Sequence, residues 1–266
     1  VPNAPKQQML FEALGEQVPI WAHVPVLVNE QRKKLSKRRD KVAVEQYREE
    51  GILAAAMVNY LMTLGWAPSG DTEIVPWHTI LEQFQLEDVN HSPAFFDIKK
   101  LLAFNGEYIR MMSLDEFIGA AEEFFSRSAT WSPDRYRPEV FRSMAPLVQT
   151  RVAVIPETIP MVDFLFLPEP SIDDEAFTKS FSPEWSVPAL REIAGEFESC
   201  EFTADSLKAA TERVGEKYQV KLGKLQAPLR VAITGRTVGP PLFEPIELLG
   251  REETLRRIHS AISRAS

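Results

Sequence analysis

Residues 19–38, PIWAHVPVLVNEQRKKLSKR, mark the place where the sequence pattern changes. The apolar run from Pro19 to Val28 contains a proline, so it predicts a short or edge strand that leads into a loop. The basic stretch Arg32–Lys41 follows this run directly. A strand followed by a lysine-rich loop is typical of an α/β unit, and we expect it to involve only about the first 40 residues.

Beyond residue 45 the sequence predicts helices with few interruptions. An apolar stripe at the helical period runs through Leu53, Met57, Tyr60, Leu61 and Leu64 and ends at Gly65. Ser113 and Glu116 form a capping-box pattern, Thr203 is a candidate N-cap, and Ser132-Pro133 predicts a helix start. The fold class that follows is mainly α.

Composition excludes several classes of protein. The chain has 266 residues, of which 44% are apolar and 26% charged, as in ordinary globular proteins. No apolar run is long enough to cross a bilayer, and the N-terminus does not resemble a secretion signal. The single cysteine, Cys200, cannot form an internal disulfide, and the four histidines are scattered. We therefore expect a cytoplasmic monomer with no membrane contact and no bound metal.

The net charge of −8 argues against a nucleic-acid partner, but its distribution does not. Asn29–Arg48 holds eight basic and three acidic residues, and Lys208–Arg236 holds seven and two. Glu157–Glu201 holds two basic and eleven acidic residues. Because local charge governs phosphate binding, this alternation is compatible with a positive face on an acidic protein. The alternative is that the charge runs are solvated surface.

The stretch Lys34-Leu35-Ser36-Lys37-Arg38 carries the most chemical information. Two lysines and a serine on a loop after a strand can surround a nucleoside triphosphate. Their charge stabilises the negative charge that grows on pyrophosphate when an acyl group attacks the α-phosphate. Lysine suits a loop that closes and reopens, because its flexible stem delivers a point charge. Five residues alone are a weak signal, since similar pentapeptides occur in surface loops.

The pentapeptide resembles the second signature of class I aminoacyl-tRNA synthetases, in the variant typical of glutamyl-tRNA synthetases. The similarity continues in order along nearly the whole chain, at Asn3–Gln7, Ala22–Pro25, Tyr47–Gly51, Asn59–Leu61, Leu64–Trp66, Phe96–Leu101, Tyr108–Arg110, Lys221–Gly223, Pro228–Arg230 and Leu248–Gly250. The resemblance implies ATP-binding residues Lys34, Leu35, Ser36, Lys37 and Arg38, with Lys37 as the catalytic contact to the ATP phosphates. ATP with Mg²⁺, glutamate and the glutamate tRNA are the implied substrates.

Two arginines are candidates for tRNA binding. Leu147–Arg151 resembles the segment whose arginine reads the third anticodon base in synthetases that distinguish glutamate tRNA from glutamine tRNA. A guanidinium can make two hydrogen bonds to an unstacked base, so Arg151 is the discriminating candidate. The alternative for Arg151 is an ordinary arginine at a helix end. Arg230 is a second candidate at the anticodon or its stem, whereas Asn105 and Arg110 are interpreted as packing and capping residues.

The resemblance also implies a domain organisation and an activity. Residues 1–42 would end a class I Rossmann-type catalytic domain, 43–112 would form a helical stem-contact domain, and 113–163 and 164–266 would form two helical anticodon-binding subdomains. The implied activity is ATP-dependent attachment of glutamate to its tRNA through a glutamyl-adenylate. The His-x-Gly-His-type signature of the family is absent, so we expect the chain alone to lack ligase activity.

The sequence has two alternative interpretations. The first is a stand-alone tRNA-binding or regulatory module without ligase activity. The second is a bacterial glutaminyl synthetase, which fits poorly because that family has β-barrels where this chain is predicted to be helical.

Overall fold

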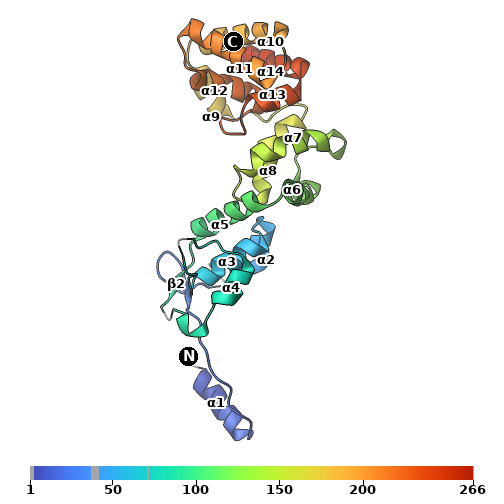
Figure 1. Cartoon of the computed structure of the whole chain (residues 1–266). Helices are drawn as coiled ribbons and strands as arrows, with labels where there is room; N and C mark the ends of the chain where they lie inside the picture. The colour runs from blue at the N-terminus through green and yellow to red at the C-terminus, as the bar shows by residue number, and fades with distance from the viewer. Residues whose placement is uncertain (1–2, 37–41, 71, 91, 266) are drawn as a thin grey trace. The chain divides into compact units, whose positions relative to one another are not determined.

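The computed structural model describes residues 3–36, 42–70, 72–90 and 92–265. These residues form fourteen α-helices, short 3₁₀ turns and one sheet of two short strands, which confirms the mainly α prediction (Figure 1). The chain divides into two compact units, Val1–Tyr108 and Ile109–Ser266, and the division falls within helix α5 (Ile98–Met111). None of the helices in the described ranges combines the length and apolar character that a bilayer crossing requires.

The first unit holds the only sheet in the described residues. Its elements are α1 (Ala4–Ala13), β1 (Leu27–Val28), α2 (Val44–Glu49), α3 (Ala54–Thr63), α4 (Trp77–Gln83), the 3₁₀ turn η1 (Leu86–Asp88), β2 (Ala94–Phe95) and the start of α5. β1 and β2 run parallel, with Leu27 opposite Ala94 and Val28 opposite Phe95. The apolar run 19–28 is a strand only at its last two residues, because Pro25 cannot donate a hydrogen bond to a neighbouring strand.

Tyr60 lies at the centre of the first unit. Its side chain is fully buried, and its ring contacts Phe96 and Phe104 edge-on at centroid distances of 5.3 and 5.9 Å. The Tyr60 hydroxyl accepts the Asp97 N–H at 2.6 Å. Burial is the main cause that raises the pKa of Tyr60 to about 12. The predicted apolar stripe on α3 therefore does supply core residues.

Asn105 confirms the packing interpretation made from the sequence. Its side chain is fully buried and accepts the Leu53 N–H at 2.7 Å through Oδ1. Its Nδ2 donates to the Gly51 carbonyl at 3.2 Å. These two bonds satisfy the backbone at the start of α3, so Asn105 serves structure rather than ligand binding.

The second unit begins with a small helical group. Its elements are the end of α5, α6 (Leu114–Ser128), η2 (Pro133–Arg135), α7 (Pro138–Gln149), η3 (Ile155–Glu157), α8 (Thr158–Val162) and η4 (Asp163–Leu165). The Ser113–Glu116 capping box at the start of α6 is confirmed. The predicted helix start at Pro133 is wrong: a single 3₁₀ turn begins there, and α7 begins at Pro138. A residue that precedes proline avoids the helical region, and Arg137 accordingly has an extended backbone.

Aromatic residues form the core of this group. The Phe125 ring contacts Trp131 and Phe141 edge-on, at centroid distances of 5.1 and 4.8 Å. Phe166, which follows η4, lies 5.0 Å from Trp131. Trp131 is thus a core residue, and residues just beyond 163 share a core with the helices before them.

The remainder of the second unit is a bundle of six helices in the described residues, α9 (Asp174–Phe181), α10 (Ser186–Ser199), α11 (Ala204–Tyr218), α12 (Leu222–Thr234), α13 (Phe243–Leu249) and α14 (Arg251–Ala265). The predicted Thr203 cap is confirmed, with its hydroxyl accepting the Ser206 N–H. α10 packs on α11 and α14 around fully buried Leu190, Ile193 and Phe197.

Gly235 ends α12 in a conformation that only glycine fits. Its φ is +76°, and a Cβ at this position would lie 2.1 Å from the Ser171 carbonyl oxygen. The Gly235 carbonyl also accepts the Asp173 N–H at 2.9 Å. The end of α12 is therefore fixed against the segment that leads into α9.

Candidate functional site

The lysine signature begins on a tight hairpin. The Leu35 N–H donates to the Leu27 carbonyl at 3.0 Å, and Lys34 forms an antiparallel bridge with Val28. The Asn29 side chain accepts two backbone N–H groups within the turn, each at 3.1 Å. Asparagine commonly closes turns in this way. The hairpin thus extends directly from β1, where the sequence predicted a strand that leads into the loop.

The structure covers only part of the predicted ATP site. Lys34 is exposed, and Leu35 and Ser36 are half-buried. Lys37 and Arg38 lie outside the described residues. The predicted contacts of this stretch with ATP therefore stay predictions, although the exposed Lys34 is accessible to a phosphate.

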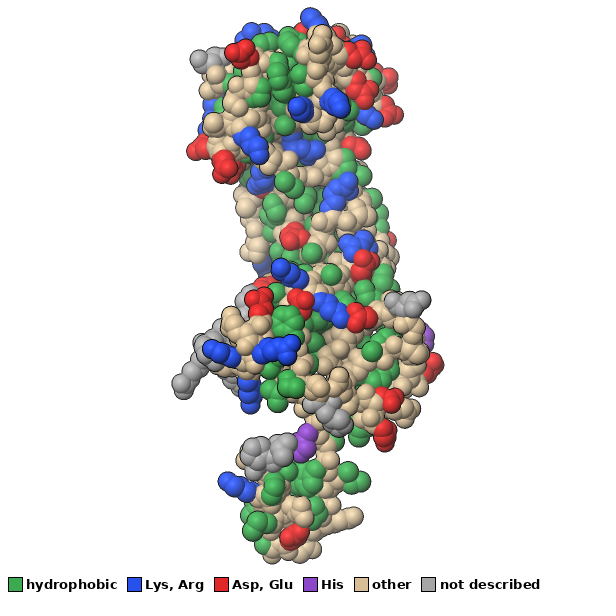
Figure 2. All heavy atoms as spheres, turned by 90° about the vertical axis from the view of Figure 1, so that its left-hand side faces the viewer, with side chains coloured by type: hydrophobic (Ala, Val, Ile, Leu, Met, Phe, Trp, Pro, Cys, Tyr) green, Lys and Arg blue, Asp and Glu red, His purple; other side chains and the backbone are tan. Residues whose placement is uncertain are grey.

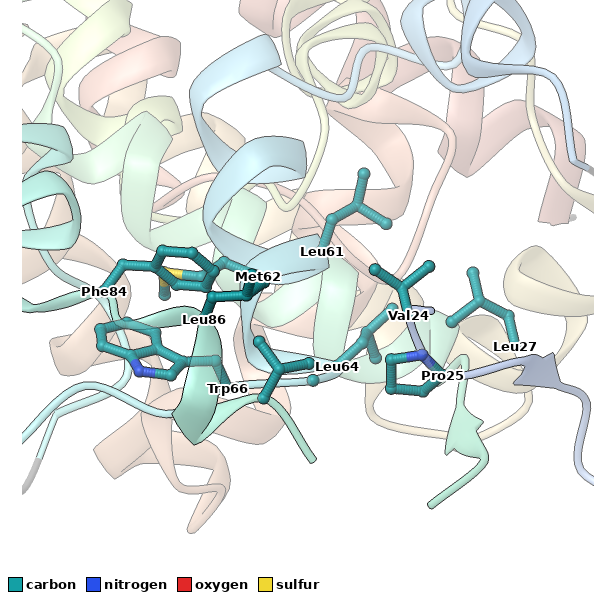
Figure 3. A pocket seen from close by; sticks show the side chains of 11 residues that line it. Val24, Pro25, Leu27, Leu61, Met62, Leu64, Trp66, Phe84 and Leu86 are labelled. Carbon is teal, nitrogen blue, oxygen red and sulfur yellow. The ribbon is translucent and has the colours of Figure 1, made fainter. Parts of the chain in front are cut away.

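An apolar cavity of about 320 Å³ lies beside the hairpin (Figure 3). Val24, Pro25 and Leu27 contribute from the run before the hairpin, and Leu61, Trp66 and Phe84 contribute from the helical part. No charged or hydroxyl side chain lines the cavity. It therefore offers no ligand for a phosphate, and any triphosphate bound by the signature would lie outside it.

Arg151 lies at the end of α7, as its alternative interpretation predicted. Its Nη1 donates to the Leu147 carbonyl at 2.7 Å and to the Thr150 hydroxyl at 3.2 Å. A guanidinium in this place stabilises the unpaired carbonyls and the negative dipole end of the helix. The side chain is nonetheless exposed, and within the described ranges its Nε and Nη2 groups have no partner. A capping role therefore leaves donors for a ligand.

Arg230 lies on α12, and its charge interacts with that of Arg151 although the two residues are far apart in sequence. Its Nη1 donates to the Pro240 carbonyl at 2.6 Å. Burial lowers the pKa of Arg230, and the positive charge of Arg151 lowers it further. A Cβ on Gly239 would lie 3.3 Å from the Arg230 Nη1. The fold thus places the two tRNA-binding candidates in one electrostatic environment.

No carboxylate balances this pair within the part of the chain that the structure describes. Neither Arg151 nor Arg230 forms a salt bridge there. Because the positive charge of Arg151 disfavours that of Arg230, an anion or the acceptor groups of a base would reduce this repulsion.

The basic stretch Lys208–Arg236 is only partly available to a ligand. Two of its residues pair with α10, Arg213 with Glu196 at 2.5 Å and Lys217 with Glu192 at 2.6 Å. Figure 2 shows Lys and Arg interleaved with Asp and Glu on one face of the molecule, rather than a patch of one sign. The charge alternation in the sequence therefore reflects in part internal ion pairing between the acidic and basic segments.

Two arginines with partners distant in the sequence were not candidates from the sequence. Arg236 binds Asp163 through two hydrogen bonds of 2.7 and 2.6 Å, and this contact raises the pKa of Arg236. Arg257 is 2% exposed and donates to carbonyls of Phe164, Ile233 and Leu167. Spacing cannot reveal such contacts, because their partners lie some 24 to 93 residues away in the chain.

Comparison with known proteins relates the chain to two families. Residues 1–103 match the family described as tRNA synthetases class I (E and Q), catalytic domain. Residues 110–262 match the family described as anticodon binding domain. The second match alone covers more than half of the chain, and the two meet close to the division between the structural units.

Individual relatives match over nearly the whole chain. The glutamate–tRNA ligases of Salinispora tropica and Frankia casuarinae are each 56% identical to it, over 98% of the chain and 57% and 56% of their own lengths. A solved glutamate tRNA ligase from Elizabethkingia meningosepticum, in complex with its amino acid, superposes with a TM-score of 0.79 at 27% identity, over 100% of this chain and 55% of its own. The chain thus spans somewhat more than half the length of these relatives.

Proposed function

Because the chain belongs to the class I tRNA synthetases for glutamate and glutamine, with a catalytic-domain match followed by an anticodon-binding match, we propose that it is part of a glutamate–tRNA ligase. The observation that carries this proposal is 56% identity to glutamate–tRNA ligases over 98% of the chain. In the complete enzyme, the glutamate carboxylate would attack the α-phosphate of ATP, which forms glutamyl-adenylate and releases pyrophosphate. Transfer of glutamate from the adenylate to its tRNA would then release AMP.

The first unit would supply the ATP-phosphate loop. The hairpin at residues 27–36 presents Lys34 to solvent at the edge of a two-stranded sheet, and Lys37 and Arg38 follow it in the sequence. The loop would bind the phosphates of ATP with Mg²⁺ as substrate and stabilise the charge that develops on pyrophosphate.

The second unit would bind the anticodon of glutamate tRNA. The charge of Arg151 lowers the pKa of Arg230, and neither arginine forms a salt bridge in the described residues. Donors directed at a shared ligand, without a competing carboxylate, suit the edges of unstacked bases. We also propose the domain division at 1–42, 43–112, 113–163 and 164–266, a monomeric state and a cytoplasmic location, as the sequence predicted.

The test is tRNA binding by the chain as it stands, without ATP or glutamate. We expect binding to glutamate tRNA that weakens as salt rises, because the arginines and lysines release condensed counterions. Arg151→Gln should lower affinity for glutamate tRNA by about 1–3 kcal/mol and narrow the gap to glutamine tRNA. A contact to phosphate would instead weaken both tRNAs equally.

The matched control for this test is Arg213→Gln. Arg213 also carries one positive charge in the same unit, but it is paired with Glu196. The Arg213→Gln substitution should leave the ratio of the affinities for glutamate tRNA and glutamine tRNA unchanged. An Arg151→Gln variant with an unchanged ratio would remove Arg151 from base recognition, whereas a chain that binds neither tRNA would contradict the proposed function itself.

A further inference from the structure

The two candidate arginines come from separate segments, so their spacing depends on contacts between those segments. Arg151 follows α7, and Arg230 lies on α12. Base recognition by two side chains requires their donors to stay within a fraction of an ångström of one geometry. A contact that fixes α12 against the segment after α7 would therefore decide whether both can bind one ligand.

The Asp163–Arg236 ion pair is such a contact. It is a two-point interaction, with Nη1 to Oδ1 at 2.7 Å and Nη2 to Oδ2 at 2.6 Å. The Asp163 side chain is only 5% exposed and that of Arg236 32% exposed. The same Arg236 Nη1 donates to the Pro160 carbonyl at 2.8 Å. A planar guanidinium held at two carboxylate oxygens and a carbonyl allows little rotation or sliding.

A short segment with internal hydrogen bonds joins this ion pair to Arg230. The Thr234 hydroxyl lies 2.9 Å from the Arg230 carbonyl and accepts the Arg236 N–H at 3.2 Å. Thr234 is 4% exposed, and Gly235 beside it is fixed against Ser171. The conformation of the turn between Arg230 and Arg236 is thus restricted by these contacts.

The path from the ion pair to Arg151 is equally constrained. Glu157 accepts the Ala153 N–H at 2.7 Å, which closes the turn that follows Arg151. Val152, Ile155 and Val162 are each 1% exposed or less. The chain from Arg151 to Asp163 is therefore anchored by buried apolar side chains and hydrogen bonds rather than being a free loop.

We infer that the Asp163–Arg236 ion pair is a positioning contact, which sets the spacing of the Arg151 and Arg230 guanidinium groups and thereby the discrimination between tRNAs. The inference rests on the proposed function. An ion pair with a buried member contributes little stability compared with apolar packing. Such a pair can instead serve to specify a single arrangement of the segments that it joins. Neither Asp163 nor Arg236 needs to touch the RNA.

The test compares affinities for glutamate and glutamine tRNA at one fixed salt concentration and at a temperature where every variant is folded. Asp163→Asn keeps the shape of the side chain but loses its charge, and Arg236→Lys keeps the charge but loses the two-point contact. Both should reduce the ratio of the two affinities by roughly fivefold or more, the scale of coupling between contacting groups. Glu196→Gln, which breaks the exposed Arg213 pair in the same unit, should leave the ratio unchanged.

Combination with Arg151→Ala distinguishes positioning from general destabilisation. If the ion pair acts through Arg151, Asp163→Asn should have no further effect on the ratio in the Arg151→Ala background. An equal further effect there would overturn the inference, as would an unchanged ratio in both single variants. If the unchanged chain bound neither tRNA, the proposed function would fail, and this inference would fall with it.

A measurement without tRNA distinguishes failure of this inference from failure of the proposed function. Spin labels at Ser143→Cys on α7 and Lys224→Cys on α12, in a Cys200→Ser background, report the separation of the two segments. Both labelled positions are exposed. Asp163→Asn should shift or broaden the distance distribution, whereas Glu196→Gln should not. A distribution that Asp163→Asn leaves unchanged would show that the ion pair does not fix the segments, whatever the RNA does.

Discussion

Replacing Arg257 by methionine tests how the second unit is held together. The Arg257 Nη1 donates to carbonyls of Phe164 at 2.8 Å and Ile233 at 2.9 Å, and its Nη2 donates to Leu167 at 3.1 Å. Methionine preserves most of the apolar stem but leaves three carbonyls without this donor. With about 1 kcal/mol or more for each buried acceptor left unpaired, the variant should lose about 3 kcal/mol of unfolding free energy.

The loss corresponds to a fall in Tm of roughly 6–12 °C for a unit of this size. Circular dichroism at increasing temperature measures it directly. Arg256→Met is the matched control. Both arginines bond Glu253, and Arg256 also bonds Glu169 and the Pro168 carbonyl, but the Arg256 side chain is 43% exposed. Exposed ion pairs contribute at most about 1 kcal/mol, so the control should shift Tm by only a few degrees. Equal Tm values for the two variants would refute the reasoning and show that the three carbonyls find other partners.

Three further predictions concern the other elements of the chain. In a full-length ligase that contains this chain, Lys37→Ala should slow ATP–pyrophosphate exchange about 10²-fold or more with little effect on tRNA affinity; near-normal exchange would make Lys37 an ordinary surface lysine. Ser113→Ala removes the cap of α6 and should lower the unfolding free energy by about 1 kcal/mol in urea titrations, whereas no change would show that the capping box is redundant. The pKa of Tyr60 rises from 10.0 to about 12 on folding. Below pH 10 the tyrosine is neutral in both states, and above pH 10 it ionises first in the unfolded chain, so the free energy of unfolding falls as the pH rises from about 10 to 12. The free energy of unfolding of Tyr60→Phe should therefore fall less steeply between about pH 10 and 12 than that of the unchanged chain. An equal slope in both proteins would assign the loss of stability to other groups.

Local signals in the sequence predicted local structure well. The capping box at Ser113 and the Thr203 cap depend on residues three positions away, so a reader of the sequence sees both partners at once. The false helix start at Pro133 has the same origin. Ser-Pro is a good start signal, but Pro138 lies five residues later and forces an extended residue before it, which ends the first turn.

Non-local contacts could not be predicted in this way. Arg257 resembles any arginine on an exposed helix face until the fold surrounds it with three carbonyls from distant segments. The electrostatic effect of Arg151 on Arg230 likewise depends on the tertiary fold, because the two residues are far apart in the sequence. The family resemblance supplied both arginines as candidates, but no pattern in the sequence indicated that they interact or that Asp163 and Arg236 lie between their segments.

The exposure of α1 has a consequence for the kinetics of its hydrogen bonds. None of its ten residues is buried. Leu10, within the helix, is 62% exposed, and Leu14, just beyond its end, is 76% exposed. Helices shorter than about 12 residues are marginal in water without tertiary contacts. In this chain the amides of α1 should therefore exchange with deuterium at nearly the rate of an open peptide. Those of α14, at the other end of the chain, should exchange only when the bundle opens, because buried Ile258 and Ala261 hold that helix in its core.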